Sequence, residues 1–259
     1  MIDFARTAQG SGVIHLRDGY RRIAYTGMDL GLFALSPASV YRILSKEGLL
    51  NARSSAGGSK GKGFTQPSAV HQHWHTDIKY INFKGTFLFF MSVIDGFSRY
   101  IVHHEIRTTM STADVQLLLQ RAREKYPNAS PRLITDNGKQ YTALEFARFL
   151  QQVSIQHTTI SPGYPQANGK IERFHRTLSE ECLQRTGMLG FEDVQQQIAR
   201  YIDHYNNHRL HSSLHYLRPV DFFEGKQNSL LKERQVKLDK AAQKRRQFWQ
   251  KTELKAEAA

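Results

Sequence analysis

The sequence contains very little cysteine and no long apolar stretch. Cys182 is the only cysteine among 259 residues, which excludes an internal disulfide and every cysteine-rich zinc site. No run of 18 apolar residues occurs, and the first residues, MIDFARTAQG, lack the basic, apolar and small-residue order of a signal peptide. We therefore expect a cytoplasmic protein without a membrane partner.

Acidic charge is also scarce. The chain has 36 Lys and Arg against 23 Asp and Glu, a net charge of +13. Residues 1–70 hold 9 cations and 4 acids, residues 226–259 hold 10 and 4, and the middle is nearly balanced with 17 and 15. A balanced centre between two basic arms indicates an enzyme that acts on a polyanion such as a nucleic acid. The alternative is that the arms serve solubility only.

The N-terminal region, 1–50, has the pattern of a partial helix-turn-helix segment between Tyr20 and Leu50. Ser36 suits the cap of the second helix and Pro37 its first position. The apolar residues of that helix would face inward, and its outward residues are candidate contacts for a DNA major groove: Ser39, Arg42 and Lys46. Residues 51–70 are rich in Gly, Ser and Lys, which predicts a flexible linker.

Residues 71–190 alternate between strand and helix patterns. Three strands, a helix, a strand, a helix and a last strand are expected, in the segments 74–81, 86–95, 99–106, 111–126, 131–136, 142–152 and 154–160. This order predicts an α/β fold with a mixed five-stranded sheet flanked by helices. Residues 191–225 read as a helical extension of this core, and 226–259 as a basic helical tail.

Three carboxylates fall where an open sheet collects its ligands. Asp77 lies inside the first strand, where its side chain gains nothing from sheet packing. Asp136 follows the fourth strand and precedes an Asn-Gly turn signal, and Glu172 lies near the start of the helix after the last strand. Pairing of the first and fourth strands would bring the two aspartates together. Alternatively, Asp136 only forms a turn and Glu172 belongs to a solvated helix face.

Three carboxylates at one place require cations, because close like charges raise each other's pKa. Oxygen ligands favour Mg²⁺ or Mn²⁺. Two such ions, about 3.5 to 4 Å apart, assist phosphoryl transfer by activating the attacking oxygen and stabilising the leaving one. On this hypothesis Asp77, Asp136 and Glu172 are both the catalytic and the metal-binding residues.

The order of four motifs carries a family resemblance. There are 58 residues between Asp77 and Asp136 and 35 between Asp136 and Glu172. The motifs are WHTDI, VIDGFSRYIV, LITDNGKQY and SPGYPQANGKIERFHRTL. With these in register the chain resembles the integrase-core transposases of bacterial insertion sequences, relatives of retroviral integrase. The likeness covers Trp74 to about Leu178 and continues more loosely through YIDHYNNHRLHSSLHYLRPVDFF.

The resemblance implies an RNase H-like fold and a DDE-type polynucleotidyl transferase. Such an enzyme cuts at transposon ends and joins the freed 3′-hydroxyl to target DNA without a covalent protein–DNA intermediate. The first Asp of the family bridges two divalent metals, while the second Asp and the Glu each hold one. The expected partners are double-stranded DNA, as transposon ends and as target, and further copies of the chain, at least a dimer in the synaptic complex. When bound to DNA the protein would be associated with the nucleoid.

The helix that contains Glu172 is also expected to contact DNA. The resemblance assigns such contacts to Asn168 and Arg176, and Arg176 shares a helix face with Glu172. Lys170 and Arg173 are further candidates for holding DNA phosphates. Where related integrases often carry lysine, this chain has Ser179, which is a departure from the family pattern.

The N-terminal segment departs from the family too, because longer products carry an additional upstream helix-turn-helix. We therefore expect an upstream-frame partner protein or a fusion to complete recognition of the transposon end. Two other functions stay open: a catalytically silent DNA-binding remnant or regulator derived from a transposase, and a general RNase H-type nuclease.

Several other features have two interpretations each. The segment HQHWH places His71, His73 and His75 at metal-binding spacing, although phosphate or solvent contacts are the favoured interpretation. Asp95 is either a fourth acidic group or the cap of a turn, with the cap favoured. The segment YNNHRLHSSL either contacts DNA or packs on the core. Ser161 to Gln166 is expected to form a mobile flap over the substrate.

Overall fold

The computed structural model describes residues 19–50, 65–160, 168–184 and 187–257. Most of the expected linker and the whole expected flap, 161–166, lie outside the described residues. The described residues form two compact units. We call them the core unit, within Gly58–Arg209 and Arg218–Glu224, and the helical unit, within Met1–Gly57, Leu210–Leu217 and Gly225–Ala259.

The core unit is built on a mixed five-stranded sheet in the order β3-β2-β1-β4-β5. β1 pairs with β2, and β2 with β3, in antiparallel fashion, whereas β1, β4 and β5 run parallel. The strands are β1 (His73–Phe83), β2 (Thr86–Asp95), β3 (Ile101–Arg107), β4 (Arg132–Thr135) and β5 (Gln156–Thr159). The predicted five-stranded mixed sheet is confirmed, and the first strand lies beside the fourth, which is the pairing that would bring the two aspartates together.

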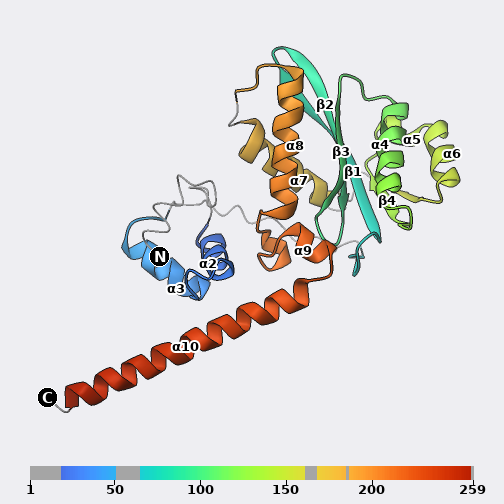
Figure 1. Ribbon diagram of the computed structural model, residues 1–259. Helices are drawn as coiled ribbons and strands as arrows, with labels where there is room; N and C mark the ends of the chain where they lie inside the picture. The colour runs from blue at the N-terminus through green and yellow to red at the C-terminus, as the bar shows by residue number, and fades with distance from the viewer. Residues whose placement is uncertain (1–18, 51–64, 161–167, 185–186, 258–259) are drawn as a thin grey trace. The chain divides into compact units, whose positions relative to one another are not determined.

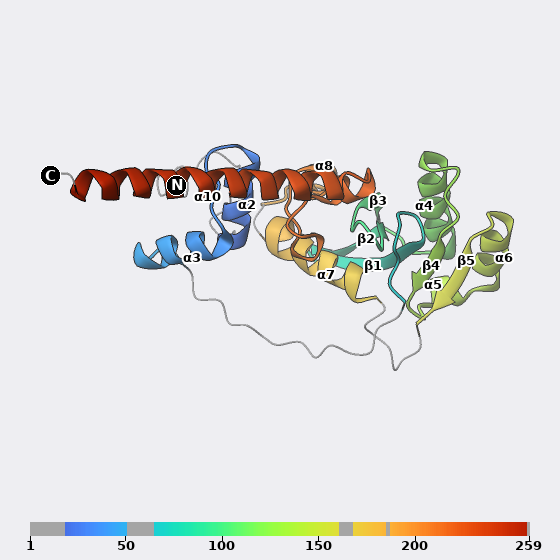
Figure 2. The same cartoon turned by 90° about the horizontal axis from the view of Figure 1, so that it is seen from below.

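Helices cover both faces of this sheet, as Figures 1 and 2 show. One face carries α4 (Thr112–Lys125), α5 (Lys139–Thr142) and α6 (Leu144–Gln152). The other carries α7 (Gly169–Leu178), the π-helical turn η2 (Ser179–Leu183) and α8 (Phe191–Asn207). The short helix α9 (Pro219–Phe223) packs against α8.

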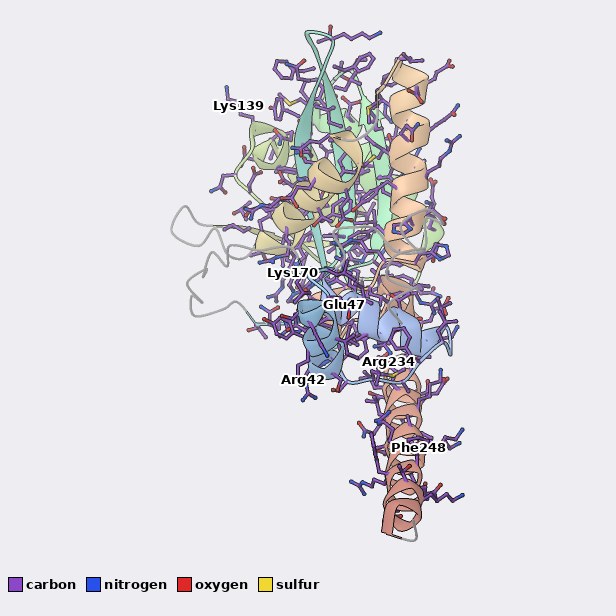
Figure 3. All side chains as sticks on the ribbon, turned by 90° about the vertical axis from the view of Figure 1, so that its left-hand side faces the viewer. Arg42, Glu47, Lys139, Lys170, Arg234 and Phe248 are labelled. Atoms are coloured by element: carbon purple, nitrogen blue, oxygen red, sulfur yellow. The ribbon has the colours of Figure 1, made fainter. Side chains whose placement is uncertain are left out.

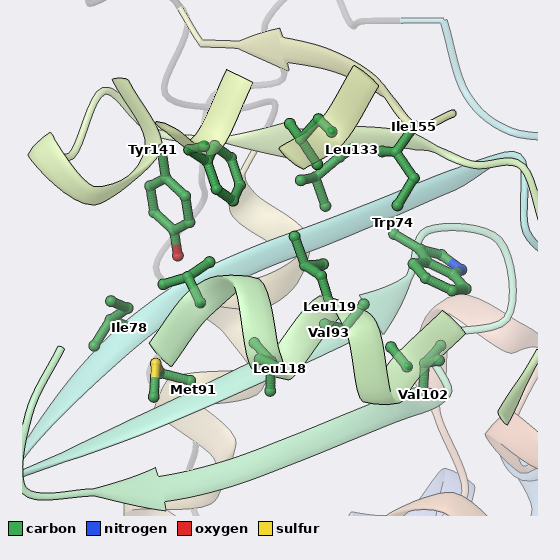
Figure 4. Close-up of a cluster of buried hydrophobic side chains, with 14 of the residues drawn as sticks. Trp74, Ile78, Met91, Val93, Val102, Leu118, Leu119, Leu133, Tyr141 and Ile155 are labelled. Atoms are coloured by element: carbon green, nitrogen blue, oxygen red, sulfur yellow. The ribbon is translucent and has the colours of Figure 1, made fainter. Parts of the chain in front are cut away.

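Strand periodicity explains why the sheet has two apolar faces. Trp74 and Ile78, an even number of residues apart, point into the cluster with α4 to α6 (Figure 4), whereas Ile81 belongs to the cluster with α7 and α8. Phe90 and Phe174 join the sheet to α7 in that second cluster. Each fully buried large apolar side chain stabilises the fold by about 1.5–3 kcal/mol.

The helix predicted over 111–126 begins where expected, whereas the predicted start of the third strand was wrong. Ser111 caps α4 in a reciprocal capping box with Asp114. The third strand was expected to begin at Arg99, but β3 begins at Ile101. Arg99 instead has a φ of 62°, because the chain turns back over Asp95 before the strand begins.

The helical unit contains the two predicted N-terminal helices and the basic tail. They are α2 (Tyr20–Asp29), α3 (Pro37–Lys46) and α10 (Gln227–Glu257), accompanied by the short turn η3 (Ser212–Leu214). The side chain of Ser36 caps α3 as predicted by accepting a hydrogen bond from the Ser39 amide. Val40 and Leu44 are buried against α2. Within the described residues, no helix combines the length and apolar character that crossing a membrane requires.

Candidate active site

Asp77 lies in β1, and Asp136 directly follows β4, the strand that runs parallel beside β1. The β1–β4 ladder pairs His75 with Ile134. Two residues further along each strand, this register aligns Asp77 with Asp136, which directly follows β4. Neighbouring strands are about 4.8 Å apart, so the two backbones are close at this point.

The environment of Tyr141 on α5 supports this placement. The side chain is 2% exposed and lies in the apolar cluster with its hydroxyl directed toward the sheet (Figure 4). Burial, together with the negative charges of Asp77 and Asp136, raises the pKa of Tyr141. Both carboxylates are therefore near enough to the hydroxyl of Tyr141 to contribute to its raised pKa.

Asp77 also faces α7, because strand alternation places it on the face opposite Ile78. Its Oδ2 lies 3.5 Å from Nδ1 of His175 on α7, and Nε2 of the same ring lies 3.4 Å from Oγ of Ser92. Ser92 is the cross-strand partner of Asp77 in β2. The buried imidazole of His175 thus connects α7 to the strand that carries Asp77.

Glu172 lies one turn before His175 and therefore on the same side of α7. Partial burial and the charge of Asp77 raise the pKa of Glu172, while His175 and Arg176 oppose the shift. The carboxylate is exposed to solvent, yet close enough to Asp77 for the two charges to interact. The helix that follows the last strand thus brings the third carboxylate to the first.

Asp136 serves its own turn as well. Its Oδ1 accepts a hydrogen bond from the Gly138 amide at 3.0 Å, and Nδ2 of Asn137 donates to the carbonyl of Ile160 at 2.9 Å. Asp136 can therefore form the turn and still be a candidate metal ligand. One carboxylate oxygen stabilises the turn, and no group among the described residues donates a hydrogen bond to the other.

The three carboxylates fit a divalent cation by their chemistry. All donors are carboxylate oxygens, the ligands that Mg²⁺ and Mn²⁺ prefer. The pKa of Glu172 is raised by partial burial and then by the negative charge of Asp77, and a cation would offset that charge. In the part of the chain that the structure describes, no three His, Cys, Asp or Glu residues are grouped closely enough to hold a metal ion. The site consists of two pairs that share Asp77. Asp136 and Glu172 are exposed, so their side chains can rotate toward Asp77 without disturbing the core.

Cations surround the start of α7. Burial and the neighbouring Arg99 lower the pKa of Lys170 to about 7, while Asp95 opposes the shift (Figure 3). Arg173 and Arg176 are exposed. This end of α7 therefore offers positive charge beside Glu172, at the positions where DNA contacts were predicted.

Asn168, the remaining predicted contact on this helix, is the N-cap residue of α7 and only 4% exposed. Its Oδ1 is buried and has no hydrogen-bond partner among the described residues. A DNA contact from Asn168 stays a prediction.

The predicted contacts on α3 are in the helical unit. Arg42 and Lys46 are exposed one turn apart, and Figure 3 shows Arg42. Ser39 is half-buried, its hydroxyl lying 3.0 Å from that of Ser36 and accepting a hydrogen bond from Arg42 at 3.4 Å. Two cations on one helix face suit a phosphate backbone, and this contact stays a prediction too.

The other polar motifs have structural roles. Asp95 is buried and caps a turn, as favoured, by accepting hydrogen bonds from the amides of His71, Phe97 and Ser98 and from the Ser98 hydroxyl. His71 precedes β1, and its Nδ1 accepts from Nε1 of Trp74 at 3.2 Å. In the segment YNNHRLHSSL, Asn206 packs on the core, in agreement with one of the two interpretations of that segment. Its side chain accepts a hydrogen bond from the backbone amide of Ile101 and donates one to the carbonyl of the same residue.

His175 and Tyr141 were missed by the reasoning from sequence. His175 lies within the apolar stripe of its helix, between Ile171 and Leu178, which is a position for a buried side chain. A histidine in such a stripe, three residues from a candidate ligand, is the signal that would have indicated it. Tyr141 lies between the Asn-Gly turn signal and the helix expected over 142–152, and no pattern in the sequence indicates that its hydroxyl lies near the carboxylates.

Replacing Glu172 by glutamine is expected to raise the thermal midpoint of the metal-free protein at pH 7 slightly, by less than about 2 °C. A carboxyl whose pKa is raised in the folded state destabilises the fold when it is ionised. The destabilisation is therefore fully present above the pKa of Glu172 in the folded state, and it is absent below the pKa of about 4.3 that a glutamate has in the unfolded chain. The gain should therefore disappear between pH 7 and pH 4 in thermal melts with EDTA.

Glu180→Gln, at an exposed position of η2, is the matched control and should give no comparable gain at pH 7. A lower midpoint for Glu172→Gln at pH 7 would show that Asp77 and Glu172 do not repel each other.

Two family models match the chain, both described as integrase core domain, one over residues 67–165 and one over residues 153–219. The transposase for insertion sequence element IS904 of Lactococcus lactis subsp. lactis (strain IL1403) is 31% identical over 195 residues, which cover 74% of this chain and 76% of that protein. The putative transposase InsK for insertion sequence element IS150 of Escherichia coli (strain K12) is 25% identical over 153 residues, or 59% and 54% of the two chains.

Solved structures share the fold. A chain of the simian T-cell lymphotropic virus intasome in complex with PP2A regulatory subunit B56 gamma superposes with a TM-score of 0.56 at 18% identity, covering 76% of this chain and 70% of that one. The catalytic core domain of BIV integrase gives 0.50 at 19% identity, covering 62% and 99%. These likenesses show that the core unit has the RNase H-like integrase fold. Together with the matching family models and the sequence relatives, they establish that the chain belongs to the integrase-core transposases of bacterial insertion sequences.

Proposed function

We propose that this transposase catalyses metal-dependent cleavage at transposon ends and transfers the freed 3′-hydroxyl into target DNA. The observation that supports the proposal is that Asp77 lies in β1, Asp136 follows the neighbouring strand β4, and Glu172 lies on α7, which packs against β1. Tyr141 senses the charges of the first two, and Glu172 senses the charge of Asp77. Three carboxylates from three separate elements suit phosphoryl transfer by a DDE-type enzyme.

In this proposal Asp77, Asp136 and Glu172 would hold two Mg²⁺ or Mn²⁺ ions. The bound ions supply Lewis acidity and offset the negative charge of the phosphodiester under attack. His175, held by Ser92, keeps the side chain of Asp77 oriented. Lys170, whose pKa of about 7 lets it gain a proton near phosphate, would help to bind the DNA backbone.

The partners follow from the same proposal. Arg173 and Arg176 would hold phosphates beside the site, with Asn168 at the start of the helix. Double-stranded DNA, as transposon end and as target, is the substrate, and at least two copies of the chain act in the synaptic complex. The exposed cations of α3 would contact DNA in a major groove, with an upstream-frame partner or fusion completing recognition of the end.

A cleavage and joining assay tests the proposal. The full chain is incubated with Mg²⁺ or Mn²⁺ and a labelled duplex that carries the element's terminal sequence, together with a supercoiled target plasmid. We expect nicking at the end and covalent joining of its 3′ strand to the plasmid, with neither product in EDTA.

Other outcomes would contradict the proposal. Specific binding of the duplex without cleavage in either metal would indicate a DNA-binding regulator instead. Degradation of an RNA–DNA hybrid without strand joining would indicate a general nuclease.

A further inference from the structure

The C-terminal part of α10 differs in composition from the rest of that helix. We call residues 243–252, QKRRQFWQKT, the basic-aromatic segment. It holds four cations and no acid, and all ten residues are exposed. The preceding part of α10 instead mixes its cations with Glu233 and Asp239.

Two large aromatic rings stand in solvent within this segment. Phe248 and Trp249 are each 61% exposed, and their ring centroids lie 5.6 Å apart in an edge-to-face arrangement. Figure 3 marks the position of Phe248 on this helix. Exposing two neighbouring rings forgoes the burial that normally stabilises such residues, which is typical of a binding surface.

Cations flank each ring. Lys244 lies four residues before Phe248 and Lys251 lies three residues after it, so both share the helix face of Phe248. Arg245 and Arg246 lie four and three residues before Trp249 and share its face in the same way. Arg245 donates a hydrogen bond to the carbonyl of Ala34 at 3.2 Å. Among the described residues, Lys244 and its neighbours Arg246 and Lys251 make no hydrogen bond or ion pair, so their charges are available to a ligand.

Simpler explanations account for only part of this pattern. Cations stabilise the C-terminal end of a helix by interacting with its dipole, but this gives no reason for the exposed rings. A second copy of the same segment would place like charges against each other. A membrane surface requires a broad apolar face, whereas Phe248 and Trp249 are the only large apolar residues of the segment.

We propose that the basic-aromatic segment binds a DNA strand whose bases are unpaired. The cations would contact phosphates, and the rings would stack on bases, which is possible only where the bases are not held inside a duplex. The identity of the polyanion as DNA rests on the proposed function. The segment would add a surface for single-stranded DNA that is distinct from the carboxylates of the core unit.

Trp249 provides a direct readout. The chain has two tryptophans, and Trp74 is fully buried in the core unit, so external quenchers report on Trp249. Adding a thymidine oligonucleotide to the full chain in EDTA should quench the emission by base stacking. A duplex of the same length should quench it much less. Trp249→Phe should remove the quenching.

A pair of double variants isolates the role of this segment. Lys244→Gln with Lys251→Gln should weaken binding of the oligonucleotide by about five- to tenfold at 0.1 M salt, because two phosphate contacts are lost. Lys232→Gln with Lys240→Gln makes the same change of charge at exposed positions of α10 outside the segment and should bind as the wild type does. Circular dichroism confirms that both variants retain the helix.

The proposal would be overturned by no quenching with the oligonucleotide, by equal quenching with the duplex, or by equal weakening in both double variants. A concentration-dependent blue shift without DNA would indicate self-association and would overturn it as well. Stronger quenching by phosphatidylserine vesicles than by the oligonucleotide would assign the segment to membranes and would also overturn it. Because this assay contains no metal and detects no cleavage, its failure leaves the cleavage and joining assay to decide the proposed function separately.

Discussion

Asp77→Asn, Asp136→Asn and Glu172→Gln are each expected to reduce DNA cleavage and joining by about a thousandfold or more. Each change removes a negative ligand of similar shape, and the loss of metal-dependent transition-state stabilisation amounts to several kcal/mol, with about 1.36 kcal/mol for each factor of ten. Asp77→Asn should have the largest effect because Asp77 is the member that both other carboxylates approach. Single-turnover rates on the labelled terminal duplex measure the effect.

The control for these variants is Glu145→Gln on α6, which neutralises an exposed carboxylate of the same unit away from the site. It should cleave at the wild-type rate. Far-ultraviolet circular dichroism and thermal melts should show that all three site variants are folded. Activity within tenfold of the wild type in any of them would remove that residue from the proposed triad.

Arg234→Met is expected to destabilise the helical unit by about 3 kcal/mol or more. Arg234, labelled in Figure 3, is 5% exposed. It forms a two-pronged ion pair with Asp29 at the end of α2, with distances of 2.8 and 2.6 Å. It also donates to the carbonyls of His215 and Tyr216, and its guanidinium lies over the ring of Tyr25. One side chain therefore joins the three separate segments of this unit.

The backbone at those carbonyls makes the interaction more important. His215 and Tyr216 have φ values of 52° and 58°, a left-handed conformation that costs a non-glycine residue free energy. The hydrogen bonds from Arg234 help to offset that cost. Without them the carbonyls lose their donor, and the turn is expected to loosen.

Hydrogen exchange of the α2 amides is the measurement for Arg234→Met. Exchange should accelerate in the variant, while amides of β1 and β2 in the core unit should exchange as in the wild type. Arg234→Lys should be intermediate, because an ammonium group cannot reproduce the two-pronged contact. Lys232→Met, at an exposed position of the same helix, should leave α2 protection unchanged. Unchanged protection in Arg234→Met would show that the ion pair contributes little to the unit.

Reasoning from sequence was most successful where the determinants are local. The capping box of Ser111 and the serine cap of α3 are each decided within three or four residues. The alternation of β1 and the apolar run of β2 likewise follow from the environment of each strand. The start of β3 was missed, because Arg99 adopts its left-handed conformation beside a turn that Asp95 caps through several hydrogen bonds.

The grouping of the chain into units lay beyond sequence reasoning. Asp29 and Arg234 are 205 positions apart, and nothing in either local pattern indicates that they pair. The region expected to form a separate basic tail thus shares a unit with the N-terminal helices. The division of the chain into five regions remains a prediction about what each region does. The two units describe only which residues pack together.

The sequence alone determined the order of the elements, the mixed character of the sheet and the identity of the three candidate carboxylates, because periodicity, caps and spacing depend on residues that are close in the chain. Only the tertiary structure decided how these residues meet. The register of β1 with β4 aligns Asp77 with Asp136, and the packing of α7 on β1 brings His175 and Glu172 toward Asp77. Those placements depend on which strands and helices bury their apolar faces together, and that choice is made by the whole core rather than by any local pattern.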